Sequence, residues 1–170
     1  MKRIKTMLIV LAGVFLLCGC TKSNIIRRES DLPPLSSEGI VWDQVWEDFQ
    51  DLYGDEARYP FIDSVNGTVN TEEKKLRLFL LLDEEISAEE GAEYATEAIK
   101  GFNDLISDQN SDYERSSDDS YGGYVSQYEI YVMVGEEDTK MDKSCWLLED
   151  TIPAGEYRPV NPEAAPKVTE

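Results

Sequence analysis

Histidine is missing from the 170-residue chain, and cysteine is scarce. Without an imidazole the protein cannot form a histidine-based catalytic triad, a histidine-ligated zinc site or a histidine pH switch. The three cysteines, Cys18, Cys20 and Cys145, are too few for a cysteine-rich metal site. These absences exclude several common kinds of catalytic and metal centre.

Basic residues are also few. The sequence has 16 Lys and Arg against 35 Asp and Glu, which gives a formal net charge of −19 at pH 7. Proteins that bind nucleic acid need clustered basic residues to displace counterions, so nucleic acid is not an expected partner. The same charge is repelled by anionic lipid head groups. The composition implies solubility and an attraction for cations.

The longest apolar run lies at the N-terminus. Lys2, Arg3 and Lys5 precede residues 7–17, which read MLIVLAGVFLL. Basic residues followed by an apolar run are typical of an export signal. At ~1.5 Å per helical residue the run covers about half of a ~30 Å hydrocarbon core, so a permanent transmembrane helix is not expected.

The apolar run ends in Leu17-Cys18-Gly19-Cys20. This end resembles the lipobox of bacterial lipoproteins, which has an aliphatic residue, two small residues and an obligatory cysteine. The resemblance covers residues 1–20 only. It implies that residues 1–19 are a signal peptide and that Cys20 receives a diacylglyceryl group and becomes the first mature residue. The alternative is an ordinary secretory signal with no lipid attached.

Lipidation at Cys20 would decide where the protein resides. Two acyl chains, such as palmitate, anchor a protein stably, so the expected location is the extracytoplasmic face of the cell membrane. The mature chain would carry a formal charge near −22, because residues 1–19 hold three of the basic residues and none of the acidic ones. Cys145 would have no disulfide partner, and a small buried apolar residue is favoured there over a reactive thiol.

Residues 20–39 are expected to form the lipidated N-terminus and a flexible linker, because this segment contains Pro33-Pro34 and no apolar period. Nineteen flexible residues would span ~25 Å. The folded domain is expected over residues 40–160, and residues 161–170 are expected to be a disordered tail.

The first half of the domain predicts a helix and two strands. Apolar residues recur every three or four positions over residues 41–53, which predicts an amphipathic helix with Ser36 or Ser37 as its cap and Gly54 as its end. Strands are expected over residues 61–69 and 76–82. The sequence NTEEKK between them is the preferred turn over Asn66-Gly67, which leaves Gly67 for a bulge or bend.

The second half predicts a helix followed by two strands. Ser87 and Glu90 fit a capping box and open a helix with an apolar face. Strands are expected over residues 124–134 and 145–148, separated by a polar loop. The order helix, strand, strand, helix, strand, strand predicts a single small α+β domain, with an antiparallel-rich sheet and helices on one face.

Three groups of residues are candidates for chemistry. Asp108, Asn110, Asp112, Ser116 and Asp119 have the spacing of calcium-loop ligands, but Tyr113 stands where glycine is needed and Arg115 where an apolar residue is usual, so a solvated acidic loop is favoured. No cofactor is expected.

The second group is Asp83-Glu84-Glu85, the best place for the paired carboxylates of a glycoside hydrolase, although charge before a helix start explains it equally well. The third is Tyr113, Tyr121 and Tyr124 around Gly122-Gly123, either a mobile interaction surface or a plain surface loop.

Two functional hypotheses follow. The first is a non-enzymatic membrane lipoprotein that presents an acidic domain to a cationic ligand or an envelope protein. The second is a carboxylate-dependent hydrolase of a cell-envelope polymer. A deep cleft with two buried acids would favour the enzyme, and a shallow surface would favour binding.

Overall fold

A computed structural model describes residues 38–55, 57–136 and 146–164 of the chain. The predicted signal peptide, Cys20, Cys145 and most of the predicted linker lie outside these residues. No helix in the described ranges is long and apolar enough to cross a membrane.

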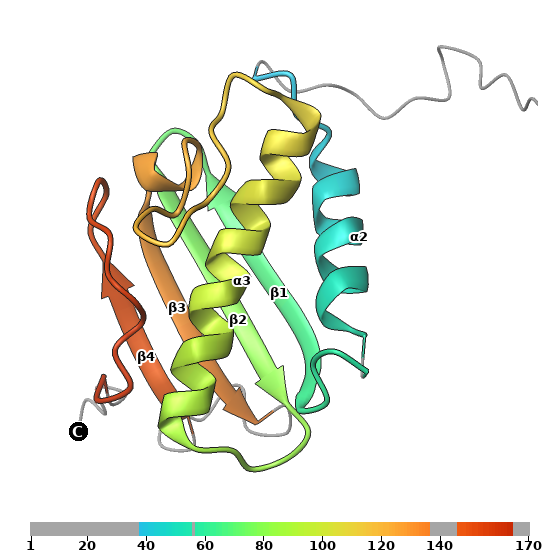
Figure 1. Cartoon of the computed structure of the whole chain (residues 1–170), viewed down its shortest axis with the longest axis vertical. Coiled ribbons are helices and arrows are strands. Elements are labelled where there is room, and N and C mark those ends of the chain that lie inside the picture. Colours follow the sequence, from blue (N-terminus) through green and yellow to red (C-terminus); the bar gives the residue numbers. More distant parts are fainter. Residues whose placement is uncertain (1–37, 56, 137–145, 165–170) are drawn as a thin grey trace, which may run out of the picture. The chain divides into compact units, whose positions relative to one another are not determined.

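The described residues form an α+β domain with a four-stranded sheet, as the sequence predicts. The elements are α2 (Trp42–Tyr53), β1 (Ile62–Asn70), β2 (Lys75–Leu82), α3 (Ala88–Gln109), a short 3-10 helix η3 (Val125–Gln127), β3 (Glu129–Glu136) and β4 (Trp146–Ile152). Both α-helices lie on one face of the sheet, where α2 packs on β1 and α3 packs on β3 and β4 (Figure 1).

The sheet order follows the chain, β1-β2-β3-β4. The two outer pairs are antiparallel, whereas β2 and β3 are parallel. Parallel neighbours need a long crossover, and the 22-residue α3, at 1.5 Å per residue about 33 Å long, returns the chain to the starting end of the sheet. The predicted antiparallel-rich sheet is therefore confirmed, with one parallel pair at its centre.

Helix α2 forms where the apolar period predicts it. Val45, Phe49 and Tyr53 recur every four residues and are buried against the sheet. The predicted serine cap is wrong, because the N-cap is Val41 and no side chain caps it. The Val41 amide donates instead to Oε1 of Gln109 at 2.7 Å, so a side chain of α3 supplies the hydrogen-bond acceptor at the start of α2.

The β1–β2 hairpin has the predicted turn after Asn70. The Asn70 side-chain oxygen accepts hydrogen bonds from the amides of Glu72 and Glu73, and this closes the turn. The bulge predicted at Gly67 is wrong, because the register shift lies between Ile62 and Ser64. Gly67 is needed for a close approach, since a Cβ there would lie 2.9 Å from the ring of Trp46.

The capping box at the start of α3 is confirmed. The Glu90 amide donates to Oγ of Ser87 at 3.2 Å, and the Ser87 amide donates to Oε2 of Glu90 at 3.1 Å. Gly91 brings the first turn of α3 close to β4, where its missing Cβ leaves room for Leu147. The apolar face of α3 then covers the sheet, with Ala95, Ala98, Ile99, Phe102 and Ile106 fully buried.

The last two strands differ from their predicted bounds. The strand predicted from residue 124 begins only at Glu129, because residues 125–127 form η3. Strand β4 is longer than the predicted 145–148 and ends at Ile152. The following segment returns along β4, where the Glu149 amide donates to the Ala164 carbonyl at 2.9 Å.

Candidate functional site

The residues with calcium-loop spacing, within 108–119, do not come together as a metal site. Arg115 forms ion pairs with Asp108 and with Asp104, the latter at 3.4 Å. The Asn110 side chain accepts from the Asp112 amide and donates to the Glu38 carbonyl, so it serves the local fold. In the described ranges no group of three or more acidic or cysteine side chains could hold a metal ion.

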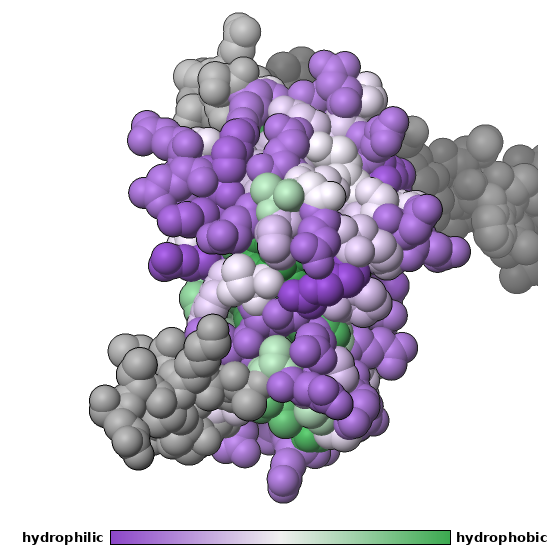
Figure 2. Space-filling model, turned by 90° about the vertical axis from the view of Figure 1, so that its left-hand side faces the viewer, coloured by the Kyte–Doolittle hydropathy of each residue, from purple (hydrophilic) through white to green (hydrophobic). Residues whose placement is uncertain are grey.

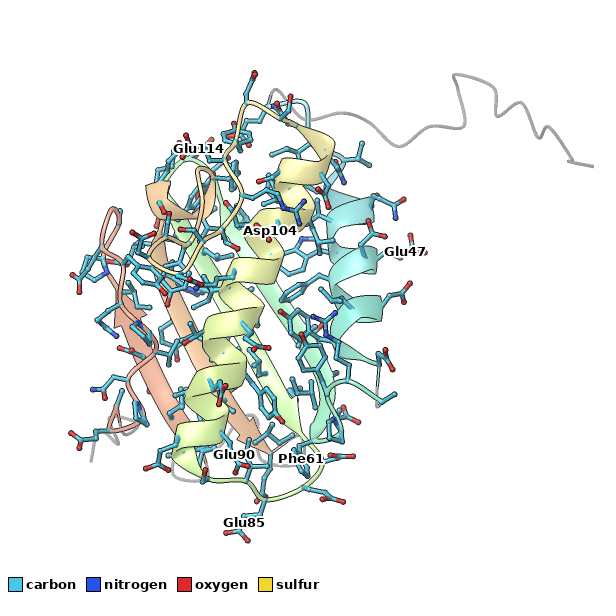
Figure 3. The ribbon with its side chains drawn as sticks, viewed as in Figure 1. Glu47, Phe61, Glu85, Glu90, Asp104 and Glu114 are labelled. Atoms are coloured by element: carbon cyan, nitrogen blue, oxygen red, sulfur yellow. The ribbon has the colours of Figure 1, made fainter. Side chains whose placement is uncertain are left out.

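The carboxylates of Asp83, Glu84 and Glu85 are all exposed. Glu84 and Glu85 line an open hollow of about 250 Å³ with Glu136 and Trp146. In Figure 3, Glu85 and Glu114 lie at opposite ends of the domain, so this segment and residues 108–119 do not meet. A glycoside hydrolase holds its paired carboxyl groups in a cleft around the substrate, whereas all three of these side chains are exposed.

The tyrosines predicted as a mobile surface belong to the core. Tyr121 and Tyr124 are 0% and 1% exposed, and only Tyr113 is partly exposed. The Tyr124 hydroxyl lies 2.6 Å from that of Tyr128 and 3.0 Å from Oε2 of Glu38. The prediction of an exposed aromatic loop is therefore wrong for two of the three residues.

A buried asparagine explains why this polar segment is ordered. Asn103 on α3 is 0% exposed, and its side-chain oxygen accepts from the amides of Tyr124 and Val125. Its side-chain nitrogen donates to the Glu114 carbonyl at 3.0 Å. Gly122, at φ +91°, passes so close that a Cβ there would lie 1.9 Å from Asn103. A single asparagine thus fixes both ends of the loop against the helix.

One acidic side chain in the described residues is buried, that of Asp150 at 8% exposure. Burial alone would raise its pKa, but hydrogen bonds from Arg158 and from the amides of Asn161 and Thr151 outweigh burial and hold the pKa below 3.8. The Arg158 contacts are 2.6 and 2.9 Å, a two-point pair that fastens the C-terminal segment to β4.

The helix layer is strongly acidic on its outer surface. Helix α2 has four acidic and no basic residues, and α3 has six acidic residues and one basic, so the two helices carry a formal charge of −9. Glu47 on α2 points away from the sheet in Figure 3. These exposed acidic side chains attract cations, but they do not form an enclosed binding site.

A groove of about 410 Å³ lies at the helix layer and is lined by residues of both helices. Arg115 and two of its acidic partners, Asp104 and Asp108, are part of this lining. The Tyr53 hydroxyl crosses the groove to donate to the Glu97 carbonyl at 2.8 Å, and Gly101 leaves room for it. Much of the polar lining of this groove is therefore engaged in hydrogen bonds and ion pairs within the domain.

The other face of the sheet is the feature that the sequence analysis missed. Leu76, Leu78 and Leu80 point under the helices and are at most 1% exposed, so the alternate residues of β2 face the opposite side. We call this side the open face. In strand order it carries Asn66 and Thr68 (β1), Lys75, Arg77, Phe79 and Leu81 (β2), Glu129, Tyr131 and Met133 (β3), and Glu149 and Thr151 (β4).

A hollow of about 360 Å³ lies on the open face, lined mainly by residues of β2, β3 and β4. The rings of Phe79 and Tyr131 meet edge-on at 6.2 Å between centroids. Burial, and then the hydrogen bond and negative charge of Glu149, raise the pKa of Tyr131, while Arg77 lowers it. Tyr131, Glu149 and Arg77 all line this hollow.

A signal for the open face is present in the sequence. The strand sequence KLRLFLLL is mostly apolar, yet its first, third and fifth residues are Lys75, Arg77 and Phe79. That alternation indicates a strand with one solvent-facing side. Elsewhere the surface is mostly hydrophilic, with a few small apolar areas on the β4 side (Figure 2).

No family model, no curated protein and no solved structure matches the chain.

Proposed function

We propose that the protein is a membrane lipoprotein, held by lipid on Cys20 at the extracytoplasmic face, whose acidic domain is a non-enzymatic binding module for a cationic ligand or a basic envelope protein. The basic head, the apolar run and the Leu17-Cys18-Gly19-Cys20 end support the anchor, because they occur together and in register.

The observation that carries the binding role is the state of the acidic side chains. Glycoside hydrolysis by two carboxyl groups needs a facing pair with one member kept protonated. Among the described residues the one buried acid is Asp150, and it is already paired with Arg158. The hollows are open rather than enclosed, which suits contact with a partner's surface.

The helix layer supports a partner of positive charge. Its formal charge of −9 is spread over exposed residues of α2 and α3, which raises the local concentration of cations and speeds encounter with a basic surface.

The anchor is tested by the mass of the mature protein isolated from membranes. Wild-type protein is expected to begin at Cys20 and to carry the added mass of a diacylglyceryl group. Cys20→Ser should lose both the added mass and the membrane association, whereas the matched Cys18→Ser keeps them. A wild-type protein of unmodified mass would overturn the anchor.

The binding role is tested by capture from solubilised membranes with two variants of equal charge. Asp43→Asn/Glu47→Gln/Asp51→Asn neutralises exposed acids of α2. Asp63→Asn/Glu72→Gln/Asp83→Asn removes the same number of exposed acids elsewhere. Basic partners captured by wild type should be lost with the first variant and retained with the second. Equal loss with both, or release of soluble sugar from envelope polymer by wild type, would contradict the proposal.

A further inference from the structure

The open face differs from the helix layer in its charge. Lys75 and Arg77 are balanced there by Glu129 and Glu149, so its formal charge is zero, against −9 for the two helices. In a chain of net charge −19 this face is a neutral surface with two aromatic rings at its centre. Neutral surfaces rich in aromatic residues are favoured in protein interfaces.

The four charges are also separated by strand. Both basic residues lie on β2, and the acidic ones lie on β3 and β4. Lys75 is in register with Glu129, and Arg77 is in register with Tyr131. The boundary between positive and negative charge therefore runs between the parallel central strands.

We infer that the open face binds the open face of a second copy of this chain, about a two-fold axis that runs parallel to β2 and β3 and between them. Such an axis preserves the position along the strands and stacks β2 of one copy over β3 of the other. Lys75 then faces Glu129 of the second copy, and Arg77 faces Tyr131 of the second copy. Each contact occurs twice, as in any two-fold interface.

Arg77 gives the dimer a specific anchor. Six of the seven basic side chains in the described ranges have an ion pair or a cation–π contact. Arg77 is the seventh, and among the described residues it has neither. The rings of Phe79 and Tyr131 are half-buried and would lose their remaining water between two sheets packed ~10 Å apart. Leu81 and Met133, already 5% and 2% exposed, add little.

Charge complementarity favours a second copy over a partner of one sign. A purely acidic or purely basic surface would place a like charge against either Glu129 or Lys75, whereas the two-fold arrangement places these two side chains opposite each other twice. Repulsion between two acidic chains is weak at this distance from the helices, because physiological salt screens charges beyond ~8 Å.

The test mixes two variants of the full-length protein, purified in excess detergent. Lys75→Glu and Glu129→Lys each place like charges across the interface of their own dimer, so each should weaken self-association by about tenfold. In an equimolar mixture every charged contact between the two variants is again opposite in sign. With one variant labelled by ¹⁵N, native mass spectrometry is expected to show mixed dimers in preference to either self-dimer.

This design isolates contacts between chains. Within each variant chain the neighbouring positions 75 and 129 carry like charges, so recovery in the mixture can come only from contacts between chains. All variants keep the same lipid anchor, so association within a micelle would affect them equally. The matched control Glu47→Arg, on the exposed side of α2, should leave wild-type dimerisation within about twofold.

Two results would overturn the inference. One is wild-type protein that remains monomeric at about 100 μM, which would leave the open face to a different partner. The other is a dimer unaffected by either substitution or a mixture without preferential mixed dimers, which would place the interface on another surface.

Discussion

Individual side chains decide how the C-terminal segment is held. Asp150 lies on β4 and is buried, and Arg158 binds it through two nitrogens while the Asn161 amide donates to it at 2.9 Å. A buried charge is tolerated only where such contacts replace its hydration. The carboxylate of Asp150 thus helps to fix the segment after β4, together with the buried side chain of Val160 and the ring contact between Tyr157 and Tyr121.

The pH dependence of this contact follows from the lowered pKa of Asp150. Because the pKa of Asp150 is lower in the folded than in the unfolded chain, its ionised carboxylate stabilises the fold. This stabilisation is complete above the unfolded pKa of about 3.9 and is lost as pH falls through the folded pKa. We expect Asp150→Asn to lower the free energy of unfolding by about 2 kcal/mol at pH 7, less than for a fully buried pair because Arg158 is one-third exposed. Urea unfolding measures this loss.

Two comparisons check that expectation. The difference between Asp150→Asn and wild type should shrink as pH falls through the lowered pKa of Asp150, because the wild-type carboxylate becomes protonated there. Glu156→Gln, which removes only an exposed 3.3 Å contact to Arg158, should change stability by less than about 0.5 kcal/mol. A loss for Asp150→Asn that does not diminish as the pH is lowered stepwise from 7 into the acid range would contradict an electrostatic origin.

Residue types alone misplace several side chains. The sequence suggests a bulge at Gly67. In the structure this position must lack a Cβ because the ring of Trp46 on α2 lies against it. Tyr121 and Tyr124 lie in a polar segment and look exposed, yet they are buried because Asn103 holds the chain against α3. Such long-range contacts have no local sequence signal.

Helices and strands are where the sequence is most informative. The apolar period predicts α2 and α3, and the Ser87–Glu90 pair predicts the start of α3 because the capping box is entirely local. The start of β3 is missed, since the preceding residues form η3, whose Val125 amide donates to the side chain of Asn103 on α3.

The capping box predicts a measurable loss. Ser87→Ala removes the oxygen that accepts from the Glu90 amide, and should lower the free energy of unfolding by about 1 kcal/mol. Glu93→Ala, an exposed change on the same helix that leaves the cap intact, should cost less than about 0.5 kcal/mol. Chemical denaturation distinguishes them, and equal losses would show that the cap does not stabilise α3.

At the scale of the whole molecule, charge is divided unevenly between two faces. The helix layer is acidic and the open face is neutral, so one domain offers two different surfaces. A cationic partner on the helices and a second copy on the open face would not compete. Dimerisation would also place two lipid anchors on one assembly and strengthen its retention on the membrane.

Self-repulsion among the acidic side chains should make stability depend on salt. Raising NaCl from about 10 to 150 mM shortens the screening length from ~30 to ~8 Å. With a net charge of −19, we expect the free energy of unfolding to rise by on the order of 1 kcal/mol over this range. Thermal unfolding with sucrose as the uncharged comparison tests this, and a stability that falls with NaCl would contradict it.

The sequence by itself determined the α+β class, the order of the elements, the α3 cap and the excess of acid, because each depends on composition or on neighbours along the chain. The Cys20 anchor also rests on the sequence alone and stays a prediction. Only the tertiary structure decided which face of the sheet is covered, which acid is buried and which loop is ordered. These depend on contacts between residues far apart in the chain, such as Asn103 with Tyr124, Arg158 with Asp150, and Arg77 in register with Tyr131.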